Sequence, residues 1–152
     1  MKKILSIVLA MTMVLAFTAC RWQVEDDGNN KFDIASQEWT MTTIQSQSAE
    51  DNGMIVAYGS DDGTSEQAAK IDMVCSAEDG QFVITDQTNN KTYSGEYTVK
   101  SKSADSTIYD ISIGDTIGMA VVSYTKYHDD SQANTLIITL EDYSLSFFEK
   151  DN

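Results

Sequence analysis

The chain has 152 residues, with 24 acidic side chains, 10 basic side chains and one histidine, which gives a formal net charge of −14. This length is enough for a single domain with one modest core. A surface this acidic repels phosphate backbones and anionic headgroups, so we expect no nucleic-acid partner.

Residues 1–19 have the pattern of a secretory signal peptide. Lys2 and Lys3 precede an apolar run from Ile4 to Phe17, which is too short to cross a bilayer as an ordinary helix. Small residues follow, and Cys20 comes directly after them. A small-residue cleavage site with cysteine immediately behind it resembles the lipobox of bacterial lipoproteins.

This resemblance implies that Cys20 receives a diacylglyceryl group, becomes the new N-terminus and anchors the protein to a membrane of the bacterial cell envelope. Two or three acyl chains anchor firmly, because each buried methylene contributes about 0.8 kcal/mol. Ordinary secretion or an uncleaved anchor are the alternatives. The resemblance does not identify the membrane or the leaflet.

Lipidation of Cys20 leaves Cys75 without a disulfide partner in the chain. Cys75 alternates with Ile71 and Met73, so we expect it to be a small buried side chain. A catalytic thiol needs a neighbouring histidine or lysine to lower its pKa, and the surrounding sequence offers neither.

Residues 20–36 are mostly polar and show little periodicity, so we interpret them as a flexible tether between the lipid and the domain. We place the folded domain at residues 37–152. Pairs of acidic residues beside Gly, Asn or Ser recur along this domain, and such pairs are typical of solvated turns.

The dominant pattern of the domain is alternation of apolar and polar residues with a period of two. It is clearest in residues 92–99, 109–113, 135–140 and 143–147. Alternation of this kind places the apolar side chains on one face of a strand. The pattern and the turn residues between its segments predict eight extended segments: 38–45, 54–59, 69–77, 80–87, 91–101, 106–113, 116–127 and 134–149, the last divided into a hairpin at Glu141-Asp142. Residues 64–70 predict a short helical turn.

Short connections favour strands that pair in chain order, and a sheet of about eight strands with one buried face tends to close on itself. We therefore predict an all-β domain, a single antiparallel up-and-down β-barrel of about eight strands. Closure also removes free edges that invite aggregation. A two-sheet β-sandwich is the alternative.

Four segments resemble bacterial lipocalin-like lipoproteins: Glu38–Thr42, Asp79–Phe82, Tyr93–Tyr97 and Tyr143–Phe147. The likeness covers about residues 37–150. Gln37 stands where lipocalins usually carry the glycine of Gly-x-Trp, so the comparison is with the broader group of such barrels. The resemblance implies that Trp39, in the first strand, closes one end of the barrel.

The predicted inward face carries large side chains, including Tyr143, that could also line a pocket. Tyrosines suit a pocket because each combines a flat apolar ring with a hydroxyl. The candidate ligand-binding residues are Trp39, Met41, Met73, Tyr93, Tyr97, Tyr109, Tyr124 and Phe147. A barrel of eight strands is either filled by its side chains or just wide enough for one small ligand, and residues this large favour a filled interior.

No segment supplies the parts of a catalytic or metal site. His128 is the only histidine, and zinc needs three or four ligands. A calcium loop starting at Asp27 fails because Phe32 occupies its glycine position. We expect no cofactor and no enzymatic activity, with a glycosidase-like carboxylate pair as the remaining enzymatic alternative.

The sequence therefore predicts a membrane-tethered, lipocalin-like barrel that binds a small apolar or amphipathic molecule. The alternative is a cell-surface interaction or inhibitor module with a filled barrel. An enclosed pocket above roughly 300 Å³ favours ligand binding, whereas a filled interior favours the alternative.

Overall fold

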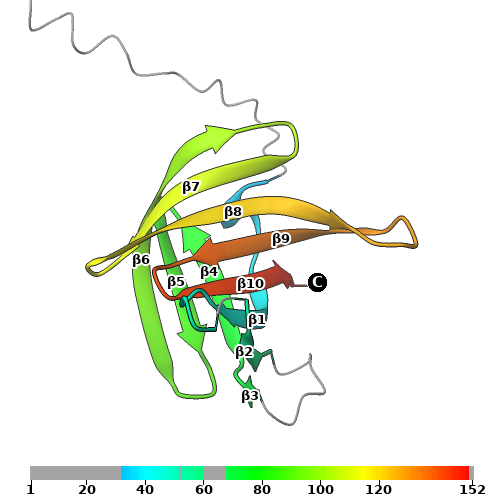
Figure 1. Cartoon of the computed structure of the whole chain (residues 1–152). Helices are drawn as coiled ribbons and strands as arrows, with labels where there is room; N and C mark the ends of the chain where they lie inside the picture. Colours follow the sequence, from blue (N-terminus) through cyan, green and yellow to red (C-terminus); the bar gives the residue numbers. More distant parts are fainter. Residues whose placement is uncertain (1–31, 52, 60–67, 151–152) are drawn as a thin grey trace, which may run out of the picture.

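The computed structural model describes residues 32–51, 53–59 and 68–150 of the chain. Within these residues it contains one short 3-10 helix and ten strands (Figure 1). In chain order they are η1 (Ile34–Ser36), β1 (Trp39–Ser46), β2 (Ile55–Tyr58), β3 (Ala69–Lys70), β4 (Met73–Glu78), β5 (Gln81–Asp86), β6 (Lys91–Lys102), β7 (Ser106–Ile113), β8 (Thr116–Lys126), β9 (Gln132–Thr139) and β10 (Tyr143–Glu149).

The strands form a closed antiparallel barrel. Strands β4 to β10 pair in chain order, β4 also pairs with β1, and β1 pairs with β10 to close the ring of eight. Two outer strands, β2 and β3, extend the sheet from β1. The closure confirms the predicted barrel, and the sandwich alternative is wrong because one continuous sheet returns to its first strand.

Alternate residues of the strands face the core, as the period-two pattern predicts. On β9, Leu136 and Ile138 are fully buried, whereas Ile137 between them is exposed. The turn between β4 and β5 also follows its sequence, because Asp79 and Gly80 both have positive φ angles of 49° and 81°. Two such residues suit the tight hairpin turn whose twist matches that of the flanking strands. Glu141 and Asp142 likewise connect β9 to β10.

The barrel wall beside β1 is made of two separate strands. The first residues of β1 pair with β4, and its later residues pair with β2. Gly59 follows β2 and donates a 2.7 Å hydrogen bond from its backbone N–H to the carbonyl oxygen of Thr42. A Cβ on Gly59 would lie 2.1 Å from the carbonyl oxygen of Met41, so no side chain fits there. Glycine thus allows β2 to end against the middle of β1.

A β-bulge in β1 changes which of its residues face inward. The register with β10 shifts between Met41 and Thr43, so that Met41 pairs with Phe147 and Ile44 pairs with Leu145. One extra residue reverses the alternation beyond that point. Trp39 and Met41 are buried before the bulge, and Ile44 and Ser46 face inward after it.

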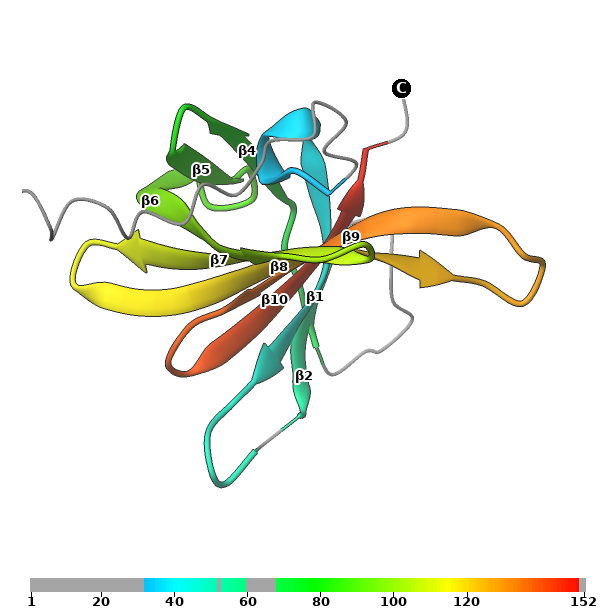
Figure 2. The same cartoon turned by 90° about the horizontal axis from the view of Figure 1, so that it is seen from above.

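The segment before β1 closes one end of the barrel. Phe32 and Ile34 are buried in the main core cluster, and Figure 2 shows η1 beside β4. The indole N–H of Trp39 donates a 2.8 Å hydrogen bond to the carbonyl oxygen of Ile34. Residues 32–36, which their composition had assigned to the tether, therefore pack with the domain.

Two predicted elements differ from the structure. The extended segment expected at residues 69–77 is divided into β3 and β4, and β3 pairs with β2 outside the ring of eight. The helical turn expected at residues 64–70 is wrong for Ala69 and Lys70, which form β3 in parallel with β2. Residues 64–67 lie outside the described part of the chain, as do the predicted signal peptide, Cys20 and the beginning of the tether.

Candidate functional site

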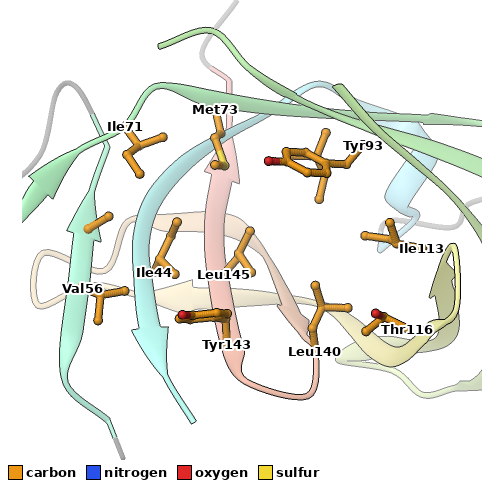
Figure 3. A pocket seen from close by; sticks show the side chains of 12 residues that line it. Ile44, Val56, Ile71, Met73, Tyr93, Ile113, Thr116, Leu140, Tyr143 and Leu145 are labelled. Carbon is orange, nitrogen blue, oxygen red and sulfur yellow. The ribbon is translucent and has the colours of Figure 1, made fainter. Parts of the chain in front are cut away.

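An apolar pocket of about 420 Å³ lies at the end of the barrel opposite η1. Side chains from every barrel strand or from its adjoining turn, together with the outer strand β2, converge on it (Figure 3). The residues that line it are Ile44, Val56, Ala57, Ile71, Met73, Ile84, Tyr93, Ile113, Thr116, Leu140, Tyr143 and Leu145. Its volume falls within the range of small-molecule sites, roughly 300–1,000 Å³.

The lining chemistry is almost entirely apolar. Nine of the twelve lining side chains are hydrocarbon or thioether groups, and none is charged. Hydroxyls come from Thr116, Tyr93 and Tyr143 alone. A few polar groups within an apolar wall are the usual composition of a pocket that holds an apolar body and orients it.

The rim of the pocket is open to solvent. Tyr93 and Tyr143 are 40% and 47% exposed, respectively, and both line the pocket. Val56, on the outer strand β2, is also exposed. A molecule can therefore enter from this end.

Part of this lining comes from the bulged strand β1 and from the outer strands beside it. The bulge in β1 turns Ile44 toward the pocket. Strand β2 adds Val56 and Ala57, and Ile71 follows β3. Ile71 is held by a 2.9 Å hydrogen bond from its backbone N–H to the carbonyl oxygen of Tyr58.

The opposite end of the barrel is filled. Trp39, Phe82, Tyr109 and Phe147 are fully buried there, together with Ile34. The Tyr109 hydroxyl accepts a 3.1 Å hydrogen bond from the backbone N–H of Ile34. Burial raises the pKa of Tyr109 to about 12, so its hydroxyl stays protonated at neutral pH.

The structure separates the predicted ligand-binding residues into two groups. Met73 and Tyr93 line the pocket, as does Tyr143. Trp39, Met41, Tyr109 and Phe147 are core residues outside the pocket lining. The fully buried Trp39 lies at the closed end, the place that the family resemblance implies for it.

The last two predicted residues also lie outside the lining. Tyr97 is half-buried and packs edge-on against Tyr109, with ring centroids 5.4 Å apart. Burial is also the main reason that the pKa of Tyr97 is raised. Tyr124 stacks on Phe32 with ring centroids 5.9 Å apart. Both rings therefore support the filled end.

Sequence reasoning missed nine of the twelve lining residues, eight aliphatic side chains and one threonine. These residues are Ile44, Val56, Ala57, Ile71, Ile84, Ile113, Thr116, Leu140 and Leu145. Most lie near a strand end that faces one set of turns. Their position near the same end of each strand could have identified them. The prediction instead selected large side chains and did not consider at which end of the barrel each one lies.

Two other hollows have a different character. One is lined by residues of the β4–β5 hairpin, including Glu78 and Asp79, and the other by polar residues and glycines of β5, β6 and β7. Both mix polar and charged groups, so neither matches the apolar pocket as a site for a hydrophobic molecule.

Within the described residues, the histidine and the buried thiol do not assemble into a site with other reactive groups. His128 is exposed in the β8–β9 turn, where hydrogen bonds from Ser131 lower the pKa of Asp129. Cys75 is fully buried, and burial raises its pKa to about 12, which confirms the expected buried side chain. The described residues contain no group of three or more His, Cys, Asp or Glu side chains that could hold a metal.

No protein-family model, curated protein or solved structure matches the chain. Within residues 32–51, 53–59 and 68–150, no helix has the length and hydrophobicity needed to cross a membrane.

Proposed function

We propose that this protein is a non-enzymatic, lipocalin-like binding protein of the bacterial cell envelope. Its apolar pocket holds one small apolar or amphipathic molecule, and a lipid on Cys20 tethers it to a membrane. The observation that carries the binding proposal is the apolar pocket of about 420 Å³, open at one end of a barrel whose other end is filled.

The pocket favours ligand binding over the alternative of an interaction module with a filled barrel. A wholly filled interior would leave no volume for a ligand, whereas this pocket, open at its rim and not fully enclosed, has a volume above roughly 300 Å³. Burial of a ligand against nonpolar side chains contributes about 25 cal/mol of favourable free energy per Å² of apolar area. Binding therefore needs no charged or metal-ligating group within the lining.

Binding is tested with the uncharged fluorescent probe N-phenyl-1-naphthylamine and the full mature chain. We expect saturable enhancement of probe fluorescence. Ala57→Phe places a ring in the pocket and should weaken binding at least about tenfold, because it removes volume that the guest requires. Ile117→Phe is the matched control, because Ile117 is 79% exposed on β8 and does not line the pocket.

Circular dichroism and the urea midpoint of each variant show whether the fold persists. Equal probe binding by the parent and a folded Ala57→Phe variant would contradict the proposed site. Absence of saturable binding by the parent chain would contradict the binding function and favour the interaction module.

The tether is tested separately. Mass spectrometry of membrane-extracted protein should find the acyl mass on Cys20, and Cys20→Ala should release the protein into the soluble fraction. Cys75→Ala is the control, because Cys75 is buried within the barrel. Unchanged membrane retention of Cys20→Ala would refute the anchor without affecting the binding proposal.

A further inference from the structure

We propose that the pocket selects an amphiphile whose head is cationic, an amine or quaternary ammonium group joined to an apolar tail. This inference rests on the proposed binding function and adds the class of ligand. The tail occupies the apolar pocket, and the head remains at the rim.

Carboxylates surround the open end of the barrel. The β1–β2 turn carries Glu50 and Asp51, the β7–β8 turn carries Asp115, and the β9–β10 turn carries Glu141 and Asp142, all of them exposed. The backbone N–H of Gln47 donates a 2.7 Å hydrogen bond to the carbonyl oxygen of Asp142. Two of the three acidic turns therefore lie side by side.

These carboxylates are not neutralised by ion pairs within the described residues. The salt bridges there join Lys100 to Asp110, Lys126 to Asp130 and Lys150 to Glu38, all away from the acidic turns. None of the three turns contains a basic residue. Lys70 ends β3 and Lys91 begins β6, so two lysines stand against the five carboxylates of the three turns, and negative charge is in excess. The opening therefore attracts cations and repels anions.

Aromatic rings add a second preference for a cation. Tyr93 and Tyr143 line the pocket at its exposed rim, and neither belongs to the aromatic ring pairs of the described residues. A cation within about 6 Å of such a ring is attracted by the electrons of its face. An anionic head at the same position would be repelled by both the ring faces and the acidic turns.

The test uses two amphiphiles with equal tails, decyltrimethylammonium and decyl sulfate, below their critical micelle concentrations. Each is titrated against the mature chain with bound N-phenyl-1-naphthylamine, and circular dichroism monitors the fold. We expect the cation to displace the probe at a concentration about tenfold lower than the anion, since the exposed carboxylates of the three turns act on the head group together. Raising the salt from 10 mM to 500 mM should reduce this preference.

The variant Asp115→Asn/Glu141→Gln/Asp142→Asn should lose most of the preference and retain probe binding. The matched control, Asp79→Asn/Asp105→Asn/Asp129→Asn, removes three carboxylates from turns at the other end and should keep the preference. Tyr143→Leu should weaken binding of the cation more than binding of the uncharged probe.

The outcomes separate the two proposals. Equal displacement by both amphiphiles, or tighter binding of the sulfate, overturns the inference about the cationic head while the pocket stands. Equal loss of preference in both triple variants also overturns it, because net charge alone would then explain the result. A parent chain that binds neither the probe nor either amphiphile overturns the binding function itself.

Discussion

The hydroxyl of Tyr109 on β7 accepts a 3.1 Å hydrogen bond from the backbone N–H of Ile34, 75 residues earlier in the chain. The same hydroxyl lies 3.3 Å from the carbonyl oxygen of Phe32, to which it donates. One buried side chain thus satisfies both a donor and an acceptor of the segment that closes the barrel.

Tyr109→Phe should therefore destabilise the protein by about 1–3 kcal/mol, because it leaves the buried N–H of Ile34 without its acceptor. Urea unfolding measures the change. Tyr124→Phe is the control, since the Tyr124 ring is partly exposed at the same end. Equal stability of the two variants would show that the hydrogen bond contributes nothing.

Deletion of residues 32–36 should lower stability by several kcal/mol. Phe32 and Ile34 are buried in the core, and burial of each such side chain contributes about 1.5–3 kcal/mol. The comparison is between a chain that begins at Phe32 and one that begins at Gln37. Identical urea midpoints for the two chains would mean that the segment is dispensable.

Alanine substitutions at two adjacent residues of β9 should lower the free energy of unfolding by very different amounts. Leu136→Ala is expected to cost about 2–5 kcal/mol, because Leu136 is fully buried. Ile137→Ala should cost less than about 1 kcal/mol, because Ile137 points to the outer face. Similar losses at the two positions, measured by urea unfolding, would contradict the assigned register.

The thiol of Cys75 should be inert in the folded protein. Its side chain is fully buried, and burial raises its pKa to about 12, so almost no thiolate exists at pH 8. In a Cys20→Ala background, Ellman's reagent should react with Cys75 only after urea is added. Rapid reaction without urea would show that this part of the core opens readily.

Stability should fall between about pH 9 and pH 12. Cys75 and Tyr109 have pKa values of about 12 when folded, against reference values of 9.0 and 10.0. The unfolded chain therefore loses these protons first, and the folded state loses up to about 1.4 kcal/mol per pH unit for each group. Below pH 9 the contribution of both groups is fully present.

The slope of unfolding free energy against pH should be shallower in Cys75→Ala/Tyr109→Phe. Because both substitutions also lower stability at neutral pH, the slopes are compared and not the absolute values. Tyr93→Phe is the control at an exposed ring. The linkage to these two groups would be disproved by parallel pH profiles of the double variant and the parent.

Much of the fold could be predicted because its strands alternate so regularly. The alternation of Tyr109 and Ile111 with polar neighbours, and a turn such as Asp79-Gly80, are local signals that need no knowledge of distant residues. Closure into a barrel followed from short connections and one buried face per strand.

The pocket could not be predicted in the same way. The bulge in β1 reverses the alternation, so that Ile44 faces the pocket, and nothing in the local pattern announces it. Which end is open depends on Phe32 and Ile34, which lie within a polar stretch and become buried through contacts across the barrel. Trp39 and Tyr93 are both large aromatic residues of the predicted inward face, yet they lie at opposite ends of the barrel.

The backbone N–H of Lys150 donates a 2.9 Å hydrogen bond to the carbonyl oxygen of Glu38, so the chain enters and leaves the barrel at one pole. A stalk that joins the domain there, whether natural or added for immobilisation, leaves the rim with Tyr93 and Tyr143 unobstructed. If the domain is held at that pole, the proposed pocket opens on the side opposite the attachment, and a ligand would approach it from solution.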